Sequence, residues 1–320
     1  MARFRSAGRI ASAAFLMLLC TTSCGTERTE TNGFLFDTYT SFVISGADSA
    51  QTADSITGAL TGLSDAFALC YTHDAADLPK NPVYGDCLRQ VLDLSSQYGG
   101  GVDVTCGALT SLWGISDGTY HIPSDGEIAD ALATITGDGT FTDGTKLDFG
   151  AAAKGYACDE ASRILAGSGA DYAVIDLSSS TLLWGEKPDG AKFRAGITHP
   201  DGNGYLGIIE TDAAYLSTSG GYERYFEADG QRFSHIMDIR TGRPAETDLV
   251  SVTVIVPAEN VGGGILSDFL STLITIEGTA QLDKWLAYEE FSVIAADENG
   301  ILHSDFPGFL PDGDSGYRYE

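Results

Sequence analysis

Apolar residues along the chain follow two different spacings. Runs rich in valine, isoleucine and aromatic residues predict strands at Tyr172 to Leu177, Leu249 to Val256 and Phe291 to Ala296. Between them, apolar residues recur at helical spacing. Helices are predicted at Val83 to Tyr98, from Ser124 to Ile135, from Ala152 to Leu165 and at Ile265 to Ile276.

Local signals support these helices. Val83 to Tyr98 is followed by three glycines, which end a helix. Asp125 and Glu127 fall in the first turn of the second helix, where negative charge suits the helix dipole. Ile265 to Ile276 is apolar nearly all round and is therefore expected to be buried. Because strands and helices do not strictly alternate, the pattern predicts an α+β fold of mixed sheets with packed helices.

The first 24 residues have the layout of an export signal. A basic start with three arginines is followed by an apolar run from Ile10 to Leu19, which is shorter than the roughly 20 residues of a membrane span. Small residues then lead to Cys24, which resembles the cleavage and lipidation site of bacterial lipoproteins. We expect an exported chain, anchored through lipid on Cys24 to the outer face of the cell membrane or the periplasmic side. The alternative is a cleaved signal without lipid.

The remaining chain is long enough for a large core. Residues 25–33 are polar and are predicted to be a tether, residues 34–306 form one compound domain or two intimate subdomains, and residues 307–320 form a polar tail. Acidic residues outnumber basic ones by 45 to 18, which argues against a nucleic-acid partner and favours a solvated acidic surface.

Cysteine usage leaves the redox state open. Apart from Cys20 and Cys24, the chain holds Cys70, Cys87, Cys106 and Cys158. An exported location permits disulfides. No CxxC pair occurs, so a zinc or thioredoxin-like site is disfavoured, and the pairing cannot be read from the spacing.

Asp268 and Thr272 stand four residues apart on an otherwise apolar helix. They therefore share one face of it. A buried carboxylate must be paired or bound to a metal, and an all-oxygen pair suits Mg²⁺ better than zinc. The alternative is a carboxylate that caps a helix and a threonine bonded back to a carbonyl.

Two further stretches carry candidate chemistry. In LDFGAAAKGY, from Leu147, small residues and Lys154 at a helix start suit a phosphate, although the spacing is not that of a Walker A loop. Tight strand-to-helix packing is the alternative. His235 stands near an acidic residue and is a candidate general base. The following Asp238, Thr241 and Gly242 predict a turn.

Taken in order, these stretches resemble the ApbE family, the FAD:protein FMN transferases. The likeness covers about residues 34 to 300. The matching stretches are Phe36-Asp37-Thr38, Gly100 to Thr105 with Leu112-Trp113-Gly114, LDFGAAAKGY, SGGYERYF from Ser219, HIMDIRTGRP from His235, SVTV from Ser251 and SDFLSTL from Ser267.

The resemblance implies roles for particular residues. Mg²⁺ would bind Asp268, Thr272 and the carbonyl of Ala151, and His235 would be the base for an accepting hydroxyl. Contacts to FAD, the substrate, are implied for Phe36, Tyr71, Gly101, Val102, Asp103, Asp148, Lys154 and Met237.

The implied reaction moves FMN from FAD to a serine or threonine hydroxyl of an exported acceptor protein and releases AMP. If water replaces the hydroxyl, the same site is an FAD pyrophosphatase. A non-catalytic FAD-binding lipoprotein is the remaining alternative. It is raised by Ser178 and Ser179, which stand where the family has two glycines.

Overall fold

Alternate residues of the central strands point into two different cores. The computed structural model describes residues 5–6 and 27–319. Phe42 and Ile44 of β3 (Thr38–Gly46) pack into the larger core, whereas Val43 between them packs into the second core. The same alternation separates Ile175 from Val174 in β4 (Ala170–Asp176). The sheet is therefore apolar on both faces and is covered on both.

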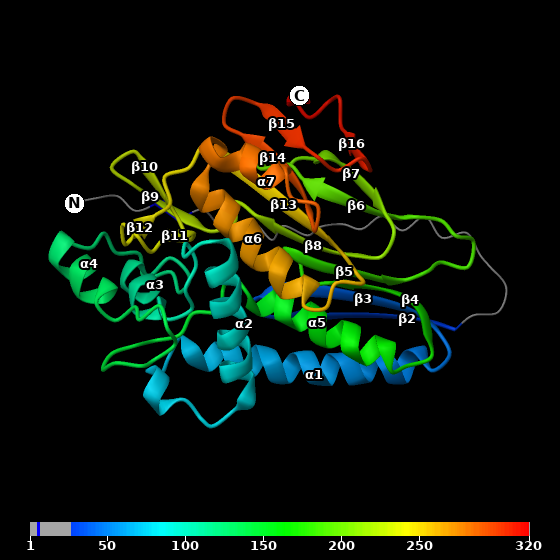
Figure 1. The fold of residues 1–320 in the computed structure, drawn as a ribbon, viewed down its shortest axis with the longest axis horizontal. Coiled ribbons are helices and arrows are strands. Elements are labelled where there is room, and N and C mark those ends of the chain that lie inside the picture. The colour runs from blue at the N-terminus through cyan, green and yellow to red at the C-terminus, as the bar shows by residue number, and fades with distance from the viewer. Residues whose placement is uncertain (1–4, 7–26, 320) are drawn as a thin grey trace.

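Nine strands form the main sheet (Figure 1), and all neighbours are antiparallel except the short β15–β17 pair. The order from one edge to the other is β17 (Arg318–Tyr319), β15 (Ile301–Ser304), β14 (Ser292–Asp297), β13 (Leu249–Pro257), β8 (Ala214–Ser219), β5 (Ser180–Gly185), β4, β3 and β2 (Arg28–Leu35).

Helices cover one face of this sheet and a small sheet covers the other. The helices are α1 (Ser49–Cys70), α2 (Pro82–Tyr98), α5 (Ala153–Ala166), α6 (Gly263–Glu277) and α7 (Leu282–Leu286), with short 3₁₀ turns at Ala75–Asp77 and Thr279–Gln281. The small sheet has the order β16 (Phe309–Pro311), β7 (Tyr205–Thr211), β6 (Phe193–Thr198).

A third apolar cluster lies at the end of the molecule drawn on the left of Figure 1. It lies among two short helices, a three-stranded sheet and a two-stranded sheet, and Trp113 and Phe226 are buried in it. The elements that contribute to the cluster are α3 (Gly107–Trp113), α4 (Asp125–Leu132), β9 (Tyr225–Ala228), β10 (Gln231–Ser234) and β11 (Met237–Asp238), while β1 (Arg5–Ser6) pairs with β9 and β12 (Arg243–Pro244) pairs with β11.

The α+β prediction is confirmed, and the three predicted strands and four predicted helices are all present. Ser124 caps α4, with the reciprocal Glu127 bond of a capping box, but the helix ends at Leu132 rather than Ile135. Nearly every residue of α6 is buried. Among residues 5–6 and 27–319, no helix has both the length and the apolar character needed to cross a membrane.

Two predicted boundaries are wrong. Residues 28–33 of the expected tether belong to β2, which pairs with β3 along its whole length. The expected tail contributes β16 and β17 to two different sheets. Both segments are polar because edge strands expose much of their surface, so their composition resembles that of a linker. Cys24 lies outside the described residues. The four cysteines at 70, 87, 106 and 158 are free thiols.

Candidate functional site

One cavity of about 620 Å³ lies between three strands and two helices. It is lined by residues at the start of β3, just after β4 and at the end of β8, and by residues at the start of α5 and in the middle of α6. Every site residue predicted from the sequence that the structure describes lines this cavity. These residues are Phe36, Tyr71, Gly101, Val102, Asp103, Asp148, Ala151, Lys154, His235, Met237, Asp268 and Thr272. Segments more than two hundred residues apart in the chain are therefore brought to one place.

Asp268 occupies the wall formed by α6. Its side chain is 4% exposed, and its Oδ2 accepts a hydrogen bond of 2.9 Å from the backbone amide of Gly155. Gly155 lies in the first turn of α5, a helix whose own N-cap residue, Ala152, makes no side-chain cap. Asp268 therefore caps the neighbouring helix, and within the described residues its Oδ1 accepts no hydrogen bond.

Thr272 lies one turn further along α6. Its Oγ1 donates to the carbonyl oxygen of Asp268 at 3.2 Å and lies 3.3 Å from Oγ of Ser219. Both bonds of the non-catalytic alternative for Asp268 and Thr272 are therefore present: the threonine bonds back to a carbonyl, and the aspartate caps a helix. Both residues nevertheless face the cavity together with Ala151.

The oxygen atoms at this wall are few. They comprise the carboxylate of Asp268, the hydroxyls of Thr272 and Ser219, and backbone carbonyls. In the described part of the chain, no group of three or more histidine, cysteine, aspartate or glutamate residues is arranged to hold a metal. A cation bound here would keep several water ligands, as Mg²⁺ commonly does.

His235 faces the cavity from the loop between β10 and β11. Its Nδ1 lies 3.2 Å from the carbonyl oxygen of Arg224. A carbonyl can only accept, so Nδ1 carries the proton and the lone pair of the neutral ring is on Nε2. Burial, aided by the positive charges of Arg224 and Lys154, lowers the pKa of His235 to about 4. The ring is therefore neutral near pH 7 and able to accept a proton.

Charged residues of both signs share this cavity. Lys154 stands in the first turn of α5, and Glu223 and Arg224 come from the segment before β9. Burial raises the pKa of Glu223, while Lys154 and Arg224 oppose that rise. The Asp148 carboxylate raises the pKa of Tyr71 across the cavity. Sequence reasoning assigned no role to Glu223 and Arg224, although a charged pair inside the aromatic run SGGYERYF was a usable signal.

The glycine-rich segment before α3 is shaped by Asp103. Its Oδ1 accepts bonds of 2.8 Å from both the amide and the hydroxyl of Thr105. A Cβ on Gly101 would lie 2.4 Å from Cδ1 of Leu273 on α6, so a larger residue here would displace the end of the Leu273 side chain. Asp103 is 7% exposed and thus fixes the loop while contributing to the cavity wall.

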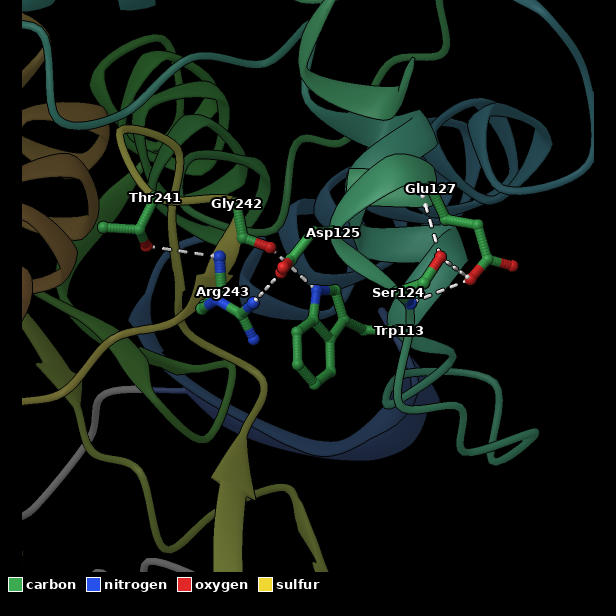
Figure 2. Close-up of polar contacts among 7 residues, drawn as sticks. All are labelled: Trp113, Ser124, Asp125, Glu127, Thr241, Gly242 and Arg243. Atoms are coloured by element: carbon green, nitrogen blue, oxygen red, sulfur yellow. Dashed lines mark hydrogen bonds and ion pairs between the residues drawn. The ribbon is translucent and has the colours of Figure 1, made fainter. Parts of the chain in front are cut away.

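The turn after β11 is tied to the third core (Figure 2). The indole Nε1 of Trp113 donates to the carbonyl of Gly242 at 2.9 Å, and Arg243 pairs with Asp125 at 2.6 Å. Gly242 has φ 71° and faces Ile128 closely, so a larger residue here would be strained. The predicted turn is present, because the amides of Thr241 and Gly242 both donate to the carbonyl of Asp238. It anchors the segment that carries His235 and Met237.

Ser178 and Ser179, where the sequence resemblance implies glycines, also line the cavity. Ser178 has φ 72°, a conformation that favours glycine. The amide of Ser178 donates to Oδ1 of Asp176 at 2.8 Å. Asp176 is 8% exposed, and burial raises its pKa to about 6.

A model of the ApbE family matches residues 68–295. The chain belongs to the ApbE family. Among curated proteins, it is 27% identical over 249 residues to the FAD:protein FMN transferase of Salmonella typhimurium and 30% identical over 211 residues to that of Escherichia coli. These alignments cover 72% and 59% of this chain, and 69% and 60% of the two relatives.

Solved structures share the ApbE fold seen here. The ApbE protein of Thermotoga maritima superposes with a TM-score of 0.75 at 24% identity, covering 86% of this chain and 96% of that one. The flavin transferase ApbE of Vibrio cholerae gives a TM-score of 0.72 at 22% identity, covering 89% of this chain and 100% of that one.

Proposed function

We propose that this chain transfers the FMN half of FAD to a serine or threonine hydroxyl of an acceptor protein and releases AMP. The observation that carries the proposal is the convergence of the predicted site residues on one cavity. Its volume of about 620 Å³ lies within the roughly 300–1,000 Å³ of small-molecule sites. The names of the curated relatives, FAD:protein FMN transferases, support the same reaction.

Asp268, Thr272 and the carbonyl of Ala151 would hold Mg²⁺ in this site. The fit rests on a buried carboxylate with an uncommitted Oδ1 and on a set of donors made only of oxygen. Bound there, Mg²⁺ would supply positive charge that stabilises the charge developing on the pyrophosphate.

The remaining steps belong to the side chains. Nε2 of His235 accepts the proton of the acceptor hydroxyl, whose oxygen forms a bond to the phosphorus of the FMN half. The bond from that phosphorus to the bridging oxygen breaks, and AMP leaves with the electron pair. Lys154, at the amino-terminal end of α5, attracts the phosphates and stabilises their charge.

Water can take the place of the acceptor hydroxyl, because the cavity opens to solvent and His235 is neutral near pH 7. The products are then FMN and AMP. A site that binds FAD without cleaving it is the other candidate, and it is favoured by the side chains of Ser178 and Ser179 in the cavity wall.

The test uses the purified chain without its first 24 residues, incubated with FAD, Mg²⁺ and the envelope fraction of the source organism. We expect a protein band that carries covalently bound, fluorescent flavin, and a matching amount of released AMP. Free FMN without labelled protein indicates the pyrophosphatase. Intact FAD bound to the chain after long incubation would contradict both enzymatic functions.

We also propose that the chain is exported and anchored by lipid on Cys24, from the basic start, apolar run and small residues of its first 24 residues. Mass spectrometry of the mature amino terminus should find a lipid-modified Cys24. A Cys24→Ser variant should be released from the membrane fraction. Retention of that variant in the membrane fraction would contradict anchoring through Cys24.

A further inference from the structure

Two exposed aromatic side chains stand together at the mouth of the cavity. Phe34 on β2 and Tyr39 on β3 are 55% and 66% exposed, and their rings meet edge to face with centroids 5.6 Å apart. Both line the cavity. Exposed apolar surface at the rim of a site commonly marks a place where a partner binds.

The hairpin that carries them is held in place. Phe36 and Asp37 form its two-residue turn with φ values of 52° and 57°, which is the geometry of a tight hairpin with a right-handed twist. The amide of Phe36 donates to Oγ of Ser64 on α1 at 2.8 Å. The aromatic pair is therefore positioned before any partner arrives, which lowers the entropic cost of binding.

β2 is also an edge of the main sheet. It pairs with β3 on one side, and within the described residues no strand pairs with its other side. Its outer row of N–H and C=O groups can hydrogen-bond to another extended chain. The side chains of Arg28, Glu30 and Asn32 lie on the same face of β2 as that of Phe34. This face of the edge strand is therefore polar up to the aromatic pair at the cavity.

We propose that the acceptor protein binds as an added strand along β2 and places an apolar side chain on Phe34 and Tyr39. This inference rests on the proposed function. A dinucleotide occupies most of a cavity of this size, so only the acceptor's hydroxyl-bearing side chain enters it and the flanking residues cross the mouth. Strand addition supplies affinity from main-chain hydrogen bonds, and a side-chain contact supplies specificity.

The test starts from a displayed library of short peptides, each with a central threonine between randomised positions. Peptides that acquire flavin from FAD in the presence of Mg²⁺ and the wild-type chain are sequenced. We expect them to share an apolar residue at a fixed distance from the modified threonine. Synthetic copies of one such peptide then serve as the substrate for kinetics.

The double variant Phe34→Ser/Tyr39→Ser should raise the KM for this peptide about tenfold while the Kd for FAD stays unchanged. Phe141→Ser is the matched control, because Phe141 is 45% exposed but lies outside the cavity lining, and its KM should equal that of the wild type. Peptide binding should also slow hydrogen exchange of the β2 amides and leave β17, at the opposite edge, unaffected.

Each outcome decides between the two proposals. A wild-type chain that labels neither an envelope protein nor any peptide would overturn the proposed function, and this inference with it. A chain that labels an envelope protein but no peptide would overturn the inference alone, because strand addition needs only an extended segment. An unchanged peptide KM in the double variant, or a loss of FAD affinity instead, would overturn the inference alone. The latter result assigns the aromatic pair to the dinucleotide. Unchanged exchange of the β2 amides in the peptide complex would rule out strand addition.

Discussion

Asp159 and Asp268 cap each other's helices. Asp268 on α6 accepts from the Gly155 amide in the first turn of α5. Asp159 on α5 accepts from the amides of Gly264 and Ile265 in the first turn of α6, both at 2.9 Å. Each carboxylate thus satisfies amides that the other helix leaves open. The cavity-facing position of Asp268 is set by this pair of caps as well as by α6 itself.

The two roles of Asp268 can be separated by substitution. Asp268→Asn retains an oxygen that can accept from Gly155 but loses the negative charge. We expect nearly wild-type thermal stability and a loss of FMN transfer of about a hundredfold or more, with weaker dependence on Mg²⁺. Asp268→Ala also loses the cap and should unfold more easily by about 1–2 kcal/mol. Full activity in Asp268→Asn would contradict a role in metal binding.

The close contact between α5 and α6 depends on two glycines, Gly155 and Gly264, that face each other. A Cβ on Gly264 would lie 2.3 Å from the carbonyl oxygen of Gly155, and a Cβ on Gly155 would lie 2.2 Å from that of Gly264. Gly264→Ala should therefore lower the free energy of unfolding by about 1–3 kcal/mol. Gly58→Ala on α1 is the control, because nothing lies within 4 Å of its added Cβ and alanine favours a helix. Chemical denaturation of both variants measures the difference.

Much of this architecture could be predicted because its signals are local. The strand β13 and the buried helix α6 show their type within their own residues. α1 was not predicted, although Ile56, Leu60 and Phe67 stand at helical spacing in it; small and polar residues between them weaken the pattern. The mutual caps of Asp159 and Asp268 lie beyond such reasoning, since they join positions more than one hundred residues apart.

The site itself was predicted through ordered motifs rather than through any single spacing. On their spacing alone, Asp268 and Thr272 fit a structural pair better than a metal site. The structure shows both structural bonds, the helix cap and the bond back to a carbonyl, in side chains that also line the cavity. β2 was mistaken for a tether because an edge strand with one exposed face needs few apolar residues. β2 belongs to the sheet because it hydrogen-bonds to β3, a pairing that its own composition does not reveal.

His235 should control the acid side of the pH profile of transfer. A general base works only when unprotonated, so activity should fall as the pH drops through about 4, the pKa to which burial and its cationic neighbours lower this ring. Arg224→Gln removes one of those cations and should move that limb to higher pH. His235→Gln should reduce kcat about a hundredfold with an unchanged Kd for FAD. The exposed His73, outside the cavity lining, provides the control His73→Gln, and equal losses in both variants would contradict the assignment.

Ser178 tests the departure from the family's glycines. Its φ of 72° places a side chain in the left-handed region, so Ser178→Gly should raise the free energy of unfolding by about 1 kcal/mol. Ser179→Gly lacks this benefit, because Ser179 has no positive φ, and should be neutral or destabilising. Calorimetry of the two single variants compares them. A more stable Ser179→Gly and an unchanged Ser178→Gly would refute the strain at Ser178.

Asp176 should make the folded protein less stable as the pH rises. Burial raises its pKa from 3.8 to about 6, so the folded state favours the protonated form. That contribution is fully present below pH 3.8 and is lost as the pH rises through about 6; the shift corresponds to about 3 kcal/mol. Asp176→Asn keeps an acceptor for the Ser178 amide and carries no charge, so it should unfold at higher temperature than the wild type at pH 7. The advantage should shrink toward zero near pH 4.

The control for this effect is Asp171→Asn on the same strand, because its side chain is exposed and its substitution should change the melting temperature little. Melting curves of the three proteins between pH 4 and pH 7 provide the measurement. A wild-type chain and Asp176→Asn that differ by the same amount at every pH would show that the Asp176 carboxyl does not titrate in this range, and that its burial is offset by its hydrogen bonds to Ser178 and Thr181.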